Sequence, residues 1–238
     1  DAWIADTLRA LGESILRTEH DLMSADAMRD AAAFLSIFAA RPPSRDRLHI
    51  FTTNYDRVIE LAADIAGIRL LDRFVGSIRP VLRTSRANLD YIWNPPGLRG
   101  EPRFVEGVAR FTKLHGSIDW QDSGQEIVRV PLGFGEASTE VPFGERMMVY
   151  PNSAKDRALR EFPFSELFRD FASSVVRSQT ALVTFGYGFG DAHVNAVISD
   201  ALRLPSTLLL VISFDDPGGR IERFVEVEGA HAQVTTLI

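Results

Sequence analysis

The chain opens with apolar residues at helical spacing. Residues 1–19 are predicted to form an amphipathic helix because the apolar positions recur every three or four residues, at Ile4, Leu8, Leu11 and Ile15. Ser24 can cap a second helix, which is expected to end at the Arg41-Pro42-Pro43-Ser44 stretch. The first part of the chain is therefore predicted to be helical.

Short apolar strands alternate with helical periods over the rest of the chain. The strands are expected at residues 48–53, 111–115, 127–130, 147–150, 181–185, 208–212 and 234–237. One helix is expected from Asp56 to Gly67, another from Pro163, and a third after its cap Asp191. Residues 68–110 fit neither period and are interpreted as an irregular insert or small subdomain.

This order of elements predicts an α/β fold. Strands that alternate with helices at this spacing form a Rossmann-like parallel sheet with helices on both faces, here with a small irregular or helical insert. We expect one domain over residues 1–238.

The amino-acid composition excludes several kinds of functional site. The 238 residues include no cysteine, which excludes disulfides, thiolate zinc sites, iron–sulfur ligation and a cysteine nucleophile. The net charge of −6 argues against general affinity for nucleic acid or anionic membranes, and we see no nucleic-acid motif. No apolar run approaches the roughly 18 residues of a spanning helix, and the N-terminus is no signal peptide, so a cytoplasmic location without membrane contact is expected.

The first candidate site is Thr52-Thr53-Asn54-Tyr55-Asp56, at the carboxyl end of a predicted strand. Ligands of open α/β sheets bind at that edge. The Asn54 amide can hold a sugar hydroxyl or a water, and the Asp56 carboxylate can accept a hydrogen bond from an amide. The alternative is an asparagine turn followed by Asp56 as a helix cap.

The second candidate is Lys113-Leu114-His115-Gly116-Ser117. The unperturbed pKa of histidine, about 6.5, suits a general base near neutrality. Gly116 would let a ligand approach the main chain. The alternative for His115 is a partly buried, hydrogen-bonded residue in a corner between a strand and a loop.

The third candidate is the glycine-containing segment 186–193, Gly-Tyr-Gly-Phe-Gly-Asp-Ala-His. Exposed main-chain N–H groups beside a helix start suit a phosphate. The glycines alternate and do not match the Gly-x-Gly-x-x-Gly fingerprint, so each could simply serve a tight turn.

In this order, the motifs resemble the sirtuin-like superfamily, and within it the bacterial branch of zinc-free, NAD-hydrolysing antiphage-defence domains. The matching stretches are Phe51–Asp56, Lys113–Trp120, Val149-Tyr150-Pro151 with Lys155, and Leu182–Asn195. The resemblance implies that Asn54 lies against the nicotinamide ribose, that Asp56 contacts the carboxamide and that His115 acts as a base. It also implies that NAD is contacted by Thr53, Gly116, Gly186, Tyr187, Gly188 and Ser213.

The activity implied by the resemblance is cleavage of NAD to nicotinamide and ADP-ribose, with NAD as substrate and without zinc. The implied role is NAD depletion in antiphage defence, by a homo-oligomer that acts with a sensor, an ATPase or an Argonaute-like partner or fused domain. Two other readings stay open: a catalytically silent subunit that binds NAD or ADP-ribose or serves as a scaffold, and a protein deacylase, which the lack of cysteines disfavours.

The chain departs from the sirtuin pattern at its start. Sirtuins open with a strand and a Gly-Ala-Gly-x-Ser phosphate loop, and residues 1–47 resemble the helices that follow that loop. Either the first strand and this loop are missing upstream of residue 1, or the cofactor site is incomplete.

Overall fold

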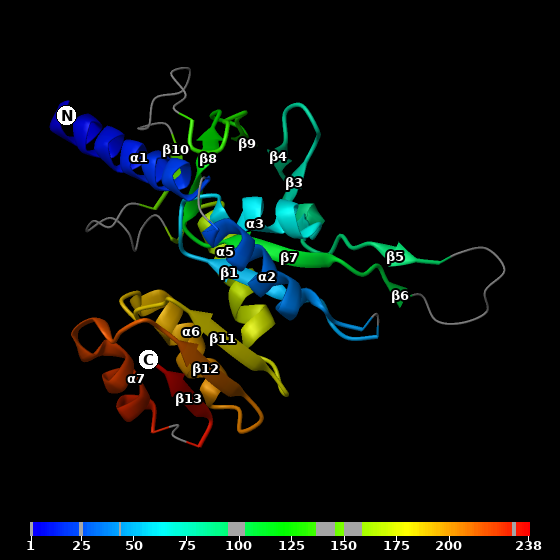
Figure 1. The fold of residues 1–238 in the computed structure, drawn as a ribbon, viewed down its shortest axis with the longest axis vertical. Coiled ribbons are helices and arrows are strands. Elements are labelled where there is room, and N and C mark those ends of the chain that lie inside the picture. The colour runs from blue at the N-terminus through cyan, green and yellow to red at the C-terminus, as the bar shows by residue number, and fades with distance from the viewer. Residues whose placement is uncertain are drawn as a thin grey trace. The chain divides into compact units, whose positions relative to one another are not determined.

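The computed structural model describes residues 2–23, 26–42, 44–94, 103–136, 146–149, 159–229 and 232–238. The chain divides into two compact units, Asp1–Leu167 (unit 1) and Phe168–Ile238 (unit 2), shown in Figure 1. Each unit contains a three-stranded parallel sheet with accompanying helices, which confirms the predicted Rossmann-like α/β class. No helix of the described part of the chain is both long and apolar enough to cross a membrane.

Unit 1 begins with two helices, α1 (Ala2–Met23) and α2 (Ala27–Ala39). Helix α1 extends four residues beyond the predicted end, and the proposed cap Ser24 lies outside the described residues. Helix α2 packs on α3 (Val58–Ala66) through a common apolar core. Its buried members are Met28, Leu35, Ala62, Ala63, Ile68 and Ala109. Gly67 ends α3 in the left-handed conformation, with φ of 67°, as predicted.

The parallel sheet of unit 1 has the order β1-β7-β2. Its strands are β1 (His49–Thr52), β7 (Val108–Lys113) and β2 (Arg69–Leu71). Thr52 is in register with Lys113, so both strands reach the same edge of the sheet. The strand expected at 111–115 therefore begins three residues earlier and ends two residues earlier than predicted, and both ends of the 68–110 range lie in this sheet.

A second, antiparallel sheet of unit 1 has the order β10-β8-β9-β4-β3. Its strands are β3 (Phe74–Val75), β4 (Val81–Leu82), β8 (Gly116–Asp122), β9 (Ile127–Arg129) and β10 (Arg146–Met148). A short helical turn η1 (Thr84–Arg86) and a hairpin of β5 (Ile92–Trp93) and β6 (Arg103–Phe104) complete the unit. Strand β8 was not predicted, whereas β9 confirms the expected strand near residues 127–130.

The units divide within α5 (Phe164–Val175), which starts after Pro163 as predicted. Unit 2 has a parallel sheet of order β11-β12-β13. Its elements are β11 (Ala181–Phe185), α6 (Ala192–Leu202), β12 (Leu208–Ile212), η3 (Pro217–Gly219), α7 (Arg220–Glu228) and β13 (Val234–Leu237). All three strands lie at the predicted residues. Helix α7 was missed, although Ile221, Phe224 and Val225 carry a helical spacing.

Candidate functional site

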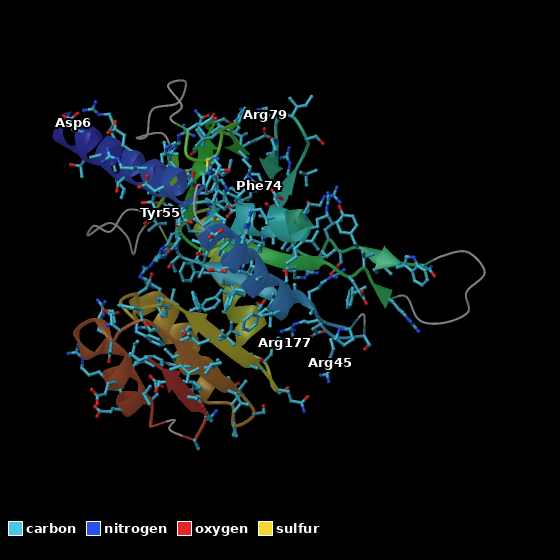
Figure 2. The ribbon with its side chains drawn as sticks, in the orientation of Figure 1. Asp6, Arg45, Tyr55, Phe74, Arg79 and Arg177 are labelled. Atoms are coloured by element: carbon cyan, nitrogen blue, oxygen red, sulfur yellow. The ribbon has the colours of Figure 1, made fainter. Side chains whose placement is uncertain are left out.

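The first two candidate motifs lie at one edge of the parallel sheet of unit 1. One follows β1 and the other follows β7, and these strands are parallel neighbours. The Leu114 N–H donates to the Thr52 carbonyl at 2.8 Å, and the Ile118 N–H donates to the Tyr55 carbonyl at 3.0 Å. Tyr55, labelled in Figure 2, therefore fixes one motif against the other. The structure brings Asn54, Asp56 and His115 together at the carboxyl edge, where ligands of such sheets bind.

Asn54 is the accessible member of this group. Asn54 is exposed, whereas the preceding Thr53 is half-buried. The Asn54 N–H donates to the Thr52 hydroxyl oxygen at 3.1 Å, which closes the main chain into a turn directly after β1. Because this bond occupies the main chain, the amide side chain can contact a ligand without unmaking the turn.

Asp56 makes a local structural hydrogen bond, but it is not the helix cap that was the alternative to ligand binding. Its Oδ1 accepts a hydrogen bond from the Val58 N–H at 3.1 Å, at the start of α3. This is a local Asx bond, because Arg57 and not Asp56 occupies the N-cap position. An ionised carboxylate has two oxygens and about four acceptor sites, so this bond leaves Asp56 capacity for an amide donor.

A buried lysine holds the main chain at Asp56. Lys113 is 2% exposed, and its ammonium group donates to the Asp56 carbonyl and, at 3.1 Å, to Oε1 of Glu60. Burial raises the pKa of the Glu60 carboxyl above its usual range, against the opposing charge of Lys113. A buried charge is costly unless it is paired, so this pair requires the turn to keep its conformation.

A second buried ion pair fixes the next residue. Glu19 of α1 is fully buried, and its carboxylate accepts from the Arg57 main-chain N–H at 2.7 Å and from its guanidinium at 2.6 Å. Glu19 also accepts from the Gly135 N–H at 3.0 Å, and Arg57 donates to the Gly133 carbonyl at 2.8 Å. This pair was not predicted from the sequence. Glu19 lies four residues after Ile15, on the apolar stripe of α1, and a charged residue in that position was the available signal.

His115 lies in the two-residue turn between β7 and β8 and is 6% exposed. Its carbonyl accepts from the Val149 N–H at 2.9 Å, and its ring lies 6.5 Å from that of Tyr55. Gly116 follows with φ of 84°, and a Cβ there would lie 1.9 Å from the Met147 carbonyl oxygen. The close approach of β10 thus accounts for this glycine, and a contact of Gly116 with NAD stays a prediction.

In unit 2, the glycine loop is residues 186–190, between β11 and α6. Gly186 has φ of 62°, and its N–H donates to the Ile212 carbonyl at 2.9 Å. The Tyr187 hydroxyl donates to Oδ1 of Asn195 at 2.7 Å, and burial raises its pKa. Phe189 packs between the rings of Tyr187 and Phe224, at centroid distances of 4.8 and 4.7 Å.

Asp191 caps α6, as predicted, by accepting from the N–H groups of His193 and Val194 at 3.0 and 3.4 Å. Ser213 is half-buried directly after β12, and its N–H donates to the Leu237 carbonyl at 2.9 Å. Phe185 is in register with Ile212, so the loop and Ser213 lie at the same edge of the unit 2 sheet. The described residues contain no group of three or more histidine or acidic side chains that could hold a metal.

The predicted motif of Tyr150, Pro151 and Lys155 lies outside the described residues.

A family model described as a SIR2-like domain matches residues 48–231. The match covers every predicted site residue and all three strands of the unit 1 parallel sheet, and it ends before β13 of unit 2. No match was found among curated proteins. SIR2-like domains bind NAD and are typically NAD-dependent enzymes. Because the match spans most of the chain, this protein belongs to the SIR2-like domain family.

Proposed function

We propose that the protein hydrolyses NAD to nicotinamide and ADP-ribose. The observation that carries the proposal is the meeting of Asn54, Asp56 and His115 at one edge of the unit 1 sheet, held there by adjacent parallel strands. An amide can position a water, a carboxylate can accept from a carboxamide and an imidazole can act as a base, and an N-glycosidic cleavage can use all three.

Each group has a task in this reaction. Asp56 accepts a hydrogen bond from the nicotinamide carboxamide and holds the leaving ring. Asn54 positions the water whose oxygen forms the new bond to C1′ of the ribose while the bond to nicotinamide breaks. His115 accepts the proton that the attacking water gives up, directly or relayed through a ribose hydroxyl, and nicotinamide departs with the electron pair of the broken bond. Holding the water and the ribose in a fixed geometry accelerates the reaction because the two reactants no longer have to meet by chance.

The buried ion pairs support this assignment. Lys113 and the Glu19–Arg57 pair hold the main chain at Asp56 and Arg57, so the turn is rigid before substrate arrives. A group held in place needs no reorganisation at the transition state, which is the main source of electrostatic catalysis.

The proposed biological role follows the resemblance of the motifs to bacterial defence domains. We propose that NAD hydrolysis depletes the cofactor during phage infection. We further propose that the protein acts in the cytoplasm as a homo-oligomer with a sensor, ATPase or Argonaute-like partner or fused domain.

A silent NAD- or ADP-ribose-binding subunit is the second candidate. It is favoured by the structural tasks already assigned to two motif residues, the Asx bond of Asp56 and the close approach at Gly116. A non-catalytic scaffold would need the Asx bond of Asp56 and the close approach at Gly116 for its fold alone.

Nicotinamide release from NAD distinguishes the two. The full-length protein, alone and with the products of neighbouring genes, is incubated with NAD and sampled by chromatography. We expect Asn54→Ala and His115→Ala each to lower the rate at least about 100-fold. Asn88→Ala and His20→Ala, which replace exposed residues of the same types, should leave it unchanged. Activity that survives both site substitutions contradicts the mechanism. Wild-type protein that binds ADP-ribose but releases no nicotinamide under any condition supports the silent subunit.

A further inference from the structure

The glycine loop of unit 2 lacks the usual source of positive charge for a phosphate. A helix N-terminus attracts anions through its free N–H groups and the positive end of its dipole. At α6 the Asp191 carboxylate already accepts from the N–H groups of His193 and Val194. The start of this helix therefore carries a negative charge of its own, and a phosphate there needs a cation from elsewhere.

Arg220 places a cation directly on the loop. A Cβ on Gly188 would lie 3.3 Å from Nη2 of Arg220, and a Cβ on Gly190 would lie 3.3 Å from its Nη1. The guanidinium thus lies over both glycines, where a larger residue would displace it. This packing accounts for the glycines at positions 188 and 190, whereas Gly186 has φ of 62° and open space beside its Cα.

Arg220 also lies where a ligand of this sheet would bind. It follows the turn after β12, and β11 and β12 are parallel neighbours whose carboxyl ends are in register. Pro217 of that turn approaches Gly188 to the same 3.3 Å, measured to the Cβ position of the glycine. The loops after β11 and β12 therefore meet under one exposed guanidinium.

The guanidinium is available for an anion. Within the described residues, no carboxylate pairs with the side chain of Arg220, whereas neighbouring Arg223 donates to the main-chain carbonyls of Gly218 and Gly219. A guanidinium presents its donors in a planar fork that matches two phosphate oxygens. Asp191 and Asp216 lie on the same loops and are negative. Main-chain hydrogen bonds and the charge of Arg223 already lower the pKa of Asp216, and Arg220 adds a second cation beside the glycines.

We propose that Arg220 binds the pyrophosphate of the adenosine diphosphate moiety at the glycine loop. The proposal rests on the proposed use of NAD and names the residue that recognises its diphosphate. It assigns Arg220 to binding and not to bond cleavage.

The test is a set of binding isotherms with the full-length protein and three probes: ADP-ribose, ADP and adenosine. We expect Arg220→Gln to weaken ADP-ribose and ADP about 10-fold or more, because a charged hydrogen bond is lost, and to leave adenosine unchanged. Arg220→Lys should recover part of the loss, since it keeps the charge without the fork. Arg203→Gln, an equal change of charge at the exposed end of α6, is the matched control and should bind all three probes as wild type does.

The dependence on salt gives a second measure. If Arg220 contacts the diphosphate, the affinity of Arg220→Gln for ADP should fall less steeply with added salt than that of wild type. Equal affinities and equal salt dependence of wild type and Arg220→Gln would overturn the inference while the proposed function stands. If Arg220→Gln weakened the binding of adenosine as much as that of ADP, Arg220 would have a structural role in the loop, and the inference would also be overturned. Wild-type protein that binds neither NAD nor ADP-ribose would instead refute the proposed function itself.

Discussion

The turn after β1 in unit 1 and the glycine loop in unit 2 occupy equivalent places, each between a parallel strand and the helix that follows it. They are stabilised in opposite ways. The unit 1 turn is held by buried charges: Lys113 on the Asp56 carbonyl and Glu19 on Arg57. These buried charged groups bind the main chain of the turn. Asn54 is the residue of the turn that stays exposed.

Within the glycine loop, ring packing and neutral hydrogen bonds replace the buried ion pairs of unit 1. The rings of Tyr187, Phe189 and Phe224 pack on one another, and the Asn195 amide donates to the Phe189 carbonyl at 3.0 Å. Its cation, Arg220, remains at the surface. The comparison shows that the charges at the unit 1 turn are buried and paired, whereas the cation beside the glycine loop stays exposed.

The largest expected effect is on the charged turn. Glu19→Gln leaves the Arg57 guanidinium buried beside a neutral amide, and we expect the free energy of unfolding to fall by about 3 kcal/mol. Chemical denaturation measures the loss. Glu13→Gln, at an exposed position of the same helix, should change it by less than about 0.5 kcal/mol. A loss for Glu19→Gln as small as that of the control would show that the turn does not depend on this pair.

A titratable group in β1 should make unit 1 sensitive to pH. Burial, followed by the charge of Arg110, lowers the pKa of His49 from 6.5 to about 3. Between these values the unfolded chain binds a proton that the folded chain does not, so stability falls as pH drops below 6.5. The slope approaches about 1.4 kcal/mol per pH unit for one such group.

Denaturation at pH 7, 6 and 5 tests this expectation. His49→Gln should show a shallower dependence on pH than wild type, whereas His20→Gln, which removes an exposed histidine, should follow wild type. Parallel curves for wild type and His49→Gln would contradict the assignment.

The smallest effect is expected in the glycine loop. Tyr187→Phe removes the hydroxyl that donates to Asn195 and keeps the ring packing, so a loss of about 1 kcal/mol is expected. This loss should not depend on salt, because no charge is removed. Tyr91→Phe, at a more exposed tyrosine, is the control and should be near neutral. If the loss of stability caused by Tyr187→Phe depended strongly on salt, the contrast between a charged turn in unit 1 and a neutral hydrogen bond in the glycine loop would be wrong.

The strands of unit 2 could be predicted from the sequence because each is a short apolar run with a turn or helix signal at its ends. The parallel order then implied that motifs after adjacent strands share an edge, as Asn54 and His115 do. Strand β8 was missed although Ile118 and Trp120 alternate with polar residues. Ser117 and Asp119 on the other face are also buried, which their polarity does not predict.

The ion pairs of the site could not be predicted from local pattern. Glu19 and Arg57 are 38 positions apart, and Lys113 reaches Asp56 from 57 positions away. Periodicity reports which face of an element is buried, and it does not report which distant charges meet there. The contact between the Arg220 guanidinium and Gly188 could not be predicted from local pattern either, because it joins the loops that follow two different strands.

The two-residue turn that carries His115 has a consequence for how a reaction could be controlled. With strands on both sides and its carbonyl bonded to Val149, this residue has little freedom to swing toward a substrate. An enzyme with such a base would not be switched on by rearranging it. If His115 is the base that we propose, regulation is expected to act on whether the dinucleotide can reach this histidine.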